Sequence, residues 1–180
     1  MTSPEIHTVG HSTHELDAFV TLLERHEVRC LADVRVHPGS RRLPHFNQGS
    51  LEHELPAHGI AYRHMRALGG RRRPQPDSPN AGWDSEAFRG YADHMRTREF
   101  LEGLEELERV AGAARTAVMC AEALWWRCHR RLISDALVVR GWRVRHISAS
   151  GELSEHELTP FALVNGAHLT YPPEQARLDV

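Results

Sequence analysis

The sequence predicts a single α/β fold of three layers, with a mostly parallel sheet of about five strands and helices on both faces. Short apolar segments that end in a glycine or a polar residue alternate with longer segments whose apolar residues recur every three or four positions. Such alternation is typical of parallel sheets covered by helices. The length of 180 residues suits one domain. We expect this domain to cover residues 1–150, and residues 151–180 to form an extended arm that packs on it or is partly disordered.

The composition is that of a water-soluble globular protein, with 41% hydrophobic and 26% charged residues. The formal net charge of −2 argues against a surface that binds nucleic acid in general. No apolar run approaches the roughly 20 residues of a membrane-spanning helix, and the N-terminus does not resemble a signal peptide. Three cysteines in such a chain indicate free thiols in the cytoplasm. The sequence does not indicate an oligomeric state.

The N-terminal part predicts two strands joined by a helix. Residues 6–10 form a short strand that ends in a glycine. Ser12 and Glu15 have the spacing of a capping box, and the apolar residues after them recur at helical spacing. Residues 28–34 form a second apolar strand, with Asp33 near its carboxyl end. Because ligands of open α/β sheets bind outside the carboxyl ends of strands, this acid is a candidate site residue.

The middle of the chain predicts a short helix, a strand and a long loop. Pro56 lies too deep in the helix over residues 50–58 for its first turn, so this helix should be kinked or partly 3₁₀. Residues 60–64 form the third strand. Residues 68–82 are rich in Pro, Gly and Arg, and unstructured loops of this length are usually functional or disordered. We expect a mobile lid, whose three adjacent arginines bind anionic groups or form a solvated tip.

The last predicted elements are two helices, a strand, a helix and a strand. Apolar spacing predicts helices over residues 84–96 and 99–112. Close packing or access to a ligand would explain Gly90 in the middle of the first of them. Residues 116–120 form a buried strand, and a helix after it leads to the strand over 142–147. That last strand alternates apolar and charged residues, which predicts a half-exposed strand at the edge of the sheet.

The strand over 116–120 ends at Cys120, and a seven-residue loop leads from it to Cys128 at the start of a helix. Free N–H groups and the helix dipole favour negative charge at such a start. Arg127 and Arg130 lie close in sequence and would favour a thiolate. We therefore predict that Cys120 is a reactive thiol in a pocket at the carboxyl edge of the sheet. A buried, inert thiol is the alternative.

The candidate site residues follow from these positions. His129 is either a general base or a residue held by a backbone carbonyl, and both interpretations stay open. The candidate catalytic residues are Cys120, Glu122 and His129. The candidate residues for binding a small anionic or nucleotide-like substrate are Gly10, His11, Ser12, Thr13, Asp33, Arg35, Arg41, Arg42, Asn47, Tyr91, Arg127, Cys128 and Arg130. The expected activity is that of a thiol-dependent hydrolase or transferase.

Several short blocks of the sequence together match one protein family. They are Val9-Gly10-His11-Ser12-Thr13, Asp33-Val34-Arg35, Ser40-Arg41-Arg42, Phe46-Asn47, Leu68-Gly69-Gly70, Phe88-Arg89-Gly90-Tyr91-Ala92 and Met119-Cys120-Ala121-Glu122 followed by Cys128-His129-Arg130. Through these blocks the chain resembles the family called domain of unknown function 488, in register over residues 6–147. One departure is Leu124-Trp125-Trp126, where such loops usually carry a Pro shortly before Cys-His-Arg. The two tryptophans would alter the pocket or offer a stacking surface.

Two other interpretations of the same residues stay open. Cys120, Cys128, His129 and His11 could form a Cys₂His₂ metal site, although their spacing matches structural zinc poorly, and haem ligation has no motif here. No residue is therefore assigned as a metal ligand, and the sequence requires no cofactor. A nucleotide or nucleic-acid binding module would instead use arginines of three loops beside the two tryptophans as a local basic patch. The net negative charge disfavours this module.

Overall fold

A computed structural model of the protein describes residues 3–177 and shows the predicted α/β architecture. The helices are α1 (Leu16–Arg25), α2 (Gln48–Glu54), α3 (Glu86–His94), α4 (Arg98–Ala113), α5 (Arg130–Val139) and α6 (Glu174–Arg177), with 3₁₀ turns η1 (Pro44–Phe46), η2 (Leu55–His58), η3 (Arg66–Leu68) and η4 (Trp125–Arg127). The strands are β1 (Glu5–Gly10), β2 (Cys30–Asp33), β3 (Ala61–His64), β4 (Thr116–Cys120), β5 (Arg143–Ile147), β6 (Leu153–Glu155), β7 (Leu163–Asn165) and β8 (His168–Thr170). No helix within the described residues is both long and apolar enough to cross a bilayer.

The main sheet has six strands in the order β3-β2-β4-β1-β5-β6, and only β6 runs antiparallel to its neighbour. Gly10 pairs with Cys120 across β1 and β4, and Asp33 pairs with Met119 across β2 and β4. The predicted parallel arrangement of these three strands is therefore confirmed. Their carboxyl ends, which carry the candidate site residues, lie side by side at one edge of the sheet.

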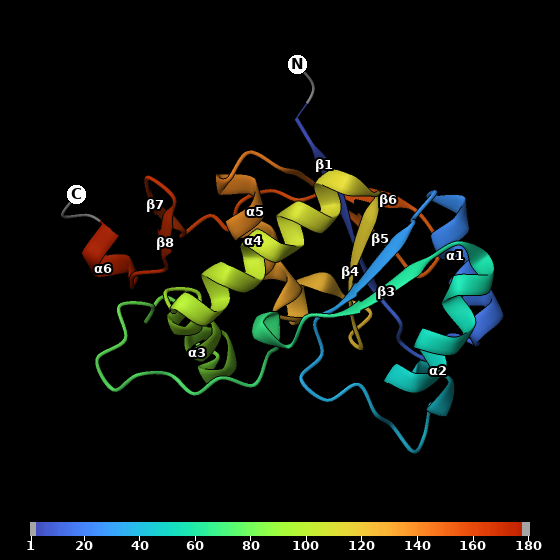
Figure 1. Ribbon diagram of the computed structural model, residues 1–180. Helices are drawn as coiled ribbons and strands as arrows, with labels where there is room; N and C mark the ends of the chain where they lie inside the picture. Colours follow the sequence, from blue (N-terminus) through green and yellow to red (C-terminus); the bar gives the residue numbers. More distant parts are fainter. Residues whose placement is uncertain (1–2, 178–180) are drawn as a thin grey trace.

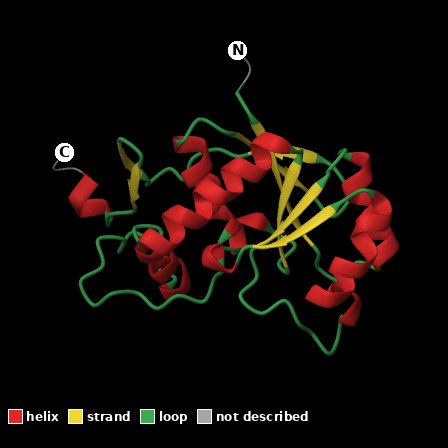
Figure 2. Ribbon diagram, in the orientation of Figure 1, coloured by secondary structure: helices red, strands yellow, loops and turns green. Residues whose placement is uncertain are grey.

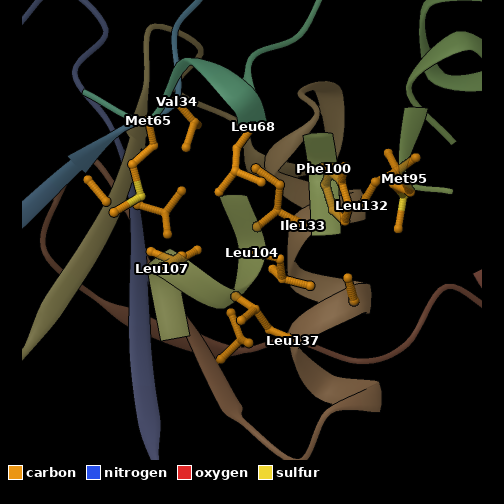
Figure 3. Packing of buried hydrophobic residues seen from close by; sticks show 14 of the residues in the cluster. Val34, Met65, Leu68, Met95, Phe100, Leu104, Leu107, Leu132, Ile133 and Leu137 are labelled. Carbon is orange, nitrogen blue, oxygen red and sulfur yellow. The ribbon is translucent and has the colours of Figure 1, made fainter. Parts of the chain in front are cut away.

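Helices cover both faces of the sheet, as predicted. Figures 1 and 2 show α1 and α2 on one side of the strands, and α3, α4 and α5 on the other. On the second side the apolar stripes of α4 and α5 meet, so that Leu104 and Leu107 lie near Ile133 and Leu137 (Figure 3). On the first side α1 contributes Phe19 and its apolar neighbours to a separate core. The sheet thus separates two hydrophobic cores, which makes the fold three-layered.

The topology explains where a ligand can bind. The chain leaves β2 toward α2 on one face of the sheet, and it leaves β4 toward α5 on the other face. β2 and β4 are neighbours, so their following loops diverge and open a crevice at their carboxyl ends. This is the position at which open α/β sheets bind ligands.

Two local predictions prove wrong, and a third is confirmed. Ser12 and Glu15 form no capping box, because α1 begins at Leu16 with Glu15 as its N-cap and no side-chain hydrogen bond there. The strand over 143–147 is not an edge strand, because β6 pairs with its outer side. The expected 3₁₀ character around Pro56 is confirmed, since α2 continues directly into η2.

The loop after η3 is packed against the domain and does not have the form of a free lid. The carboxylate of Asp93 accepts hydrogen bonds from the backbone N–H of Gln75 (2.8 Å), the hydroxyl of Ser78 (2.6 Å) and the amide of Asn80 (2.7 Å). Gly90 lies against the backbone of Arg72, where a Cβ would overlap the Arg72 carbonyl. Close packing of this loop therefore explains the glycine in the middle of α3.

The chain after residue 150 packs on the domain. β6 extends the main sheet, and β7 and β8 form a separate hairpin. Tyr171 is fully buried, and its ring lies 5.1 Å from that of Trp83. These residues show no hydrophobic period in the sequence because strands of three residues are too short to display one.

Candidate active site

A pocket of about 470 Å³ opens in the crevice between the loops that follow β2 and β4. Its lining also includes the start of the loop after η3 and one side of α3. The lining residues are Arg35, Val36, His37, Gly39, Gly70, Arg71, Ala87, Phe88, Tyr91, Cys120, Ala121, Glu122, Arg127, Cys128 and His129. The pocket thus combines two thiols, two imidazoles and three guanidinium groups with one carboxylate.

The two pocket thiols are in direct contact. The sulfur atoms of Cys120 and Cys128 lie 2.8 Å apart, and neither cysteine is in a disulfide. Cys120 ends β4, and Cys128 follows η4 just before α5. The backbone N–H of Arg130, in the first turn of α5, points at the Cys128 sulfur from 3.4 Å. Cys128 therefore receives the free N–H group that a helix start offers to a negative charge.

His129 is held in one orientation beside Cys128. Its Nε2 lies 3.0 Å from the carbonyl oxygen of Val34, which can only accept, so Nε2 carries the proton. Nδ1 lies 3.5 Å from the Cys128 sulfur and is left to receive a proton from that thiol. A nucleophile, a base and a group that orients the base are thus arranged as in thiol enzymes, with a backbone carbonyl as the third member.

The two thiols have opposite acidities. The hydrogen bond from Cys120 is the main cause that holds the pKa of Cys128 well below its ordinary value, and His129 and Arg130 act in the same direction. Burial, followed by the hydrogen bond and the charge of Cys128, raises the pKa of Cys120 well above its ordinary value. Cys128 is therefore the more acidic thiol of the pair, and Cys120 is the thiol that donates the hydrogen bond between them.

Arg130 is buried below the loop that joins β4 to α5 and does not line the pocket. Its guanidinium donates to the carbonyl oxygens of Glu122 and of Ala123, the latter at 3.3 Å. Gly10 lies against the same turn, where a Cβ would overlap the Glu122 carbonyl. Arg130 and Gly10 therefore hold the thiol loop in place, and neither lines the pocket.

A buried chain of hydrogen bonds connects Arg130 to Asp135, two residues of α5. Arg130 donates to the hydroxyl of Thr8 (3.3 Å), and Thr8 donates to Nδ1 of His146 (2.7 Å). His146 then donates through Nε2 to His156 (3.0 Å), which donates through its own Nε2 to Asp135 (2.8 Å). Thr8, His146 and His156 each accept one hydrogen bond and donate one along this path, so both histidines are satisfied when neutral. The chain connects a buried cation to a buried carboxylate.

A rigid acid–base cluster supports the opposite wall of the pocket. Asp33 is fully buried and accepts from Nε (2.9 Å) and Nη2 (2.6 Å) of Arg35, and from the hydroxyl of Tyr62 (2.6 Å). Arg35 also donates to Nε2 of His11 at 3.2 Å. Burial is the main cause that lowers the pKa of His11 to about 4. Through these hydrogen bonds Asp33 and His11 position the guanidinium of Arg35. Of these three residues, only Arg35 lines the pocket.

The charge at the rim of the pocket favours an anion. Arg71 and Arg127 are exposed, and neither side chain has a hydrogen bond or ion pair with another residue in the described part of the chain. Glu122 is the acid of the rim, and its carboxylate accepts from the backbone N–H of Leu124 (3.1 Å). Because the charge of Arg35 is balanced by Asp33, two free cations face one carboxylate.

The structure brings some of the predicted site residues together and places others elsewhere. Those that line the pocket are Arg35, Tyr91, Cys120, Glu122, Arg127, Cys128 and His129. Those that lie outside its lining are Gly10, His11, Ser12, Thr13, Asp33, Arg41, Arg42, Asn47 and Arg130. Arg41, Arg42 and Thr13 are exposed, and the side-chain oxygen of Asn47 instead accepts from the backbone N–H of Ser40.

Arg71, which the sequence analysis considers within the run of three arginines, also lines the pocket. The pocket residues without a sequence assignment are Val36, His37, Gly39, Gly70, Ala87, Phe88 and Ala121. Several of them lie in the loops next to Arg35 and Cys120, or one helical turn from Tyr91 in α3, and these positions are a signal that could have indicated them.

Within the residues described, the structure does not bring those considered for a metal site or for a basic patch into the arrangement that either site needs. Within residues 3–177, no group of three or more His, Cys, Asp or Glu side chains could hold a metal ion. Of the arginines considered for the patch, Arg131 lies over the ring of Trp83, with its guanidinium carbon 4.9 Å from the centroid. Trp125 stacks on His146 at 4.1 Å, and Trp126 is exposed.

Comparison with known proteins yields one match. The family described as "Domain of unknown function DUF488" matches residues 15–137, which is more than half of the chain. This range includes the loop with both pocket thiols and the first turns of α5. No curated protein and no solved structure matches the chain.

Proposed function

The chain belongs to the DUF488 family, and we propose that it is a thiol-dependent hydrolase or transferase with Cys128 as its nucleophile. The observation that carries the proposal is the surroundings of one sulfur at the floor of the pocket, where two groups donate hydrogen bonds to it and an imidazole nitrogen can take its proton. Cys120 lies 2.8 Å from that sulfur, the backbone N–H of Arg130 lies 3.4 Å away, and His129 lies 3.5 Å away. Three such neighbours stabilise a thiolate, which is the reactive form of cysteine.

Cys128 is the proposed nucleophile in place of Cys120, which the sequence favours. Burial and the neighbouring thiolate both raise the pKa of Cys120. Cys120 therefore stays protonated and donates a hydrogen bond to Cys128. Cys128 also has the base beside it, whereas the hydrogen-bond partners of the Cys120 sulfur within the described residues are Cys128 and the Glu122 carbonyl at 3.7 Å. Cys120 therefore tunes the nucleophile.

The chemistry follows from these positions. The Cys128 thiolate attacks an electrophilic centre of the substrate and forms a covalent bond to it, while the leaving group departs with the proton that His129 holds on Nδ1. Water or a second substrate then attacks the covalent intermediate and releases the thiolate. Glu122, at the rim, is the candidate base for this second step.

We propose a small anionic substrate, because Arg71 and Arg127 face the pocket without a protein partner in the described part of the chain. A pocket of about 470 Å³ suits a small molecule. We also propose a cytoplasmic location, since all three cysteines are free thiols.

The test is alkylation over a pH series, read by peptide mass spectrometry, with an anionic and a neutral reagent in parallel. Cys128 should react with iodoacetamide at a midpoint well below the value of about 8.5 of a free thiol, and buried Cys30 serves as the internal reference. His129→Gln should move that midpoint upward. Labelling of Cys120 before Cys128 would contradict the assignment of the nucleophile. Absence of labelling at both residues in the native protein would refute thiol catalysis.

The anionic reagent tests the rim. Arg127→Ala should lower the iodoacetate rate relative to the iodoacetamide rate by about two- to fivefold, the effect of one exposed charge pair. Arg41→Ala is the matched control, because Arg41 is exposed but lies outside the pocket lining. An equal effect of both variants would indicate a general effect of net charge and would count against an anion site at the rim.

A further inference from the structure

Cys120 is placed to do more than tune its neighbour. Its sulfur lies 2.8 Å from that of Cys128, and a disulfide bond is about 2.05 Å long. A closure of about 0.75 Å would therefore join them. The segment between the two cysteines contains only the 3₁₀ turn η4 and no strand or longer helix, so a small local shift can supply this closure.

We propose that the two cysteines form a reversible thiol–disulfide pair that reduces small anionic disulfides, with Cys128 as the attacking thiol and Cys120 as the resolving thiol. This inference rests on the proposed reactivity of Cys128 and goes beyond it, because it assigns Cys120 a covalent role and names a substrate class. The pocket supplies the access that both buried thiols need, since both line it.

The first step is an exchange at Cys128. Its thiolate attacks one sulfur of the substrate disulfide, the sulfur–sulfur bond breaks, and half of the substrate leaves as a thiolate that takes a proton. The other half stays attached to Cys128 as a mixed disulfide. Arg71 and Arg127 at the rim stabilise the carboxylates of a substrate held in this position.

The second step is resolution by Cys120. Loss of the negative charge on Cys128 removes one of the causes that raise the pKa of Cys120, while the buried guanidinium of Arg130 continues to lower it. The Cys120 proton passes to the leaving group, its sulfur bonds to Cys128, and the second half of the substrate departs. One disulfide and two protein thiols have become two small thiols and one protein disulfide, so electrons and protons balance. Excess small thiol reverses both steps.

The arrangement of the loop favours this step over escape of the mixed disulfide. Arg130 and Gly10 fix the backbone of the turn after Cys120, so the resolving sulfur stays beside the attacking one. A reaction between groups already in contact does not have to bring them together. Cys30, the remaining cysteine, is buried in β2 and does not line the pocket.

The experiment treats the reduced full-length protein with oxidised glutathione without oxygen, quenches with acid, and maps disulfides by mass spectrometry. Wild type and Cys30→Ser should both give a link between Cys120 and Cys128. Cys120→Ser should instead accumulate glutathione on Cys128, because the first step is intact and the second is blocked. Cys128→Ser should give neither product. Excess reduced glutathione should restore both thiols of the wild type.

A neutral disulfide, hydroxyethyl disulfide, separates reactivity from recognition. Arg127→Ala should slow exchange with oxidised glutathione by about two- to fivefold relative to exchange with the neutral disulfide. Circular dichroism on each variant confirms folding before comparison. Failure to form the link in folded wild type, or a link that forms equally in Cys128→Ser through Cys30, would overturn the inference. If Cys128 alkylates at low pH but forms no link, the nucleophile proposal stands alone. If Cys128 also resists alkylation, both fail.

Discussion

Replacement of Asp135 should reveal how much the buried polar chain behind the pocket stabilises the fold. Asp135 is fully buried in α5 and has three described donors. They are Nε2 of His156 (2.8 Å), the hydroxyl of Tyr171 (2.8 Å) and the backbone N–H of Thr159 (3.0 Å). All three donors lie after residue 155, so one carboxylate fastens the C-terminal segment to the domain.

The cost of removing this carboxylate follows from its partners. Asp135→Ala leaves three donors unpaired at sites that are 5% exposed or less. Each unpaired buried donor costs about 1–3 kcal/mol, so the loss of three such hydrogen bonds should cost about 3 kcal/mol or more. Asp135→Asn keeps the shape and one acceptor oxygen, and its new N–H₂ can donate to the hydroxyl oxygen of Tyr171. We expect this variant to cost only about 1–2 kcal/mol.

Urea unfolding followed by circular dichroism measures both variants. With a slope of about 1–3 kcal/mol per molar urea, the alanine variant should unfold at a urea concentration lower by roughly 2 M. Asp77→Ala is a matched control, because Asp77 is exposed and should change the midpoint little. A cost below about 1 kcal/mol for Asp135→Ala would refute the reasoning. Equal costs for the alanine and asparagine variants would show that the hydrogen bonds are not the source of the stability.

Two further predictions concern acid stability and the loop after η3. Burial is the main cause that lowers the pKa of His7 and of His11 to about 4 and that of His146 to about 2. Below pH 6.5 these three histidines therefore bind protons in the unfolded chain but stay neutral in the folded protein. Above pH 6.5 the contribution of these histidines to the free energy of unfolding should be full. Below pH 6.5 it should fall by up to about 1.4 kcal/mol per pH unit for each histidine. A flat profile of urea midpoints from pH 7.5 to 5 would contradict this prediction. Asp93→Ala removes three hydrogen bonds, so limited proteolysis within residues 70–82 should accelerate about tenfold or more, and an unchanged rate would show that other contacts hold the loop.

The sequence predicted the layers and the edge of the sheet that carries the site, because both depend on local patterns. Apolar segments that end at Gly10, Asp33 and Cys120 define three strands whether or not their order is known. Parallel pairing then brings their carboxyl ends together. Of the seven predicted residues that line the pocket, six lie within a few positions of the carboxyl end of a strand or near the start of α5. The seventh, Tyr91, lies on α3.

The predictions that the structure does not support depend on the path of a loop. Arg41 and Arg42 follow the same strand as Arg35, yet their loop turns outward and leaves them exposed. Arg71 reaches the pocket because its loop is tied to α3 by Asp93, a contact between residues that no local pattern connects. A run of arginines in a sequence shows that charge is available and does not show which member faces the ligand.

The direction of a hydrogen bond between two thiols is a further property that the sequence does not contain. Cys120 at a strand end and Cys128 before a helix are equal candidates by position. What separates them is that an N–H of the first turn of α5 and Nδ1 of His129 both point at Cys128.

Arg130 acts on three parts of the site at once. It stabilises negative charge on the thiol pair, clamps the carbonyl of Glu122, and donates to Thr8 at the start of the buried chain that ends at Asp135. A lysine could supply the charge but not the planar set of donors that reaches both the loop and Thr8. The acidity of the thiols and the attachment of the C-terminal segment are therefore coupled through one side chain. Loosening of that segment should change the reactivity of Cys128 even though no residue of the segment lines the pocket.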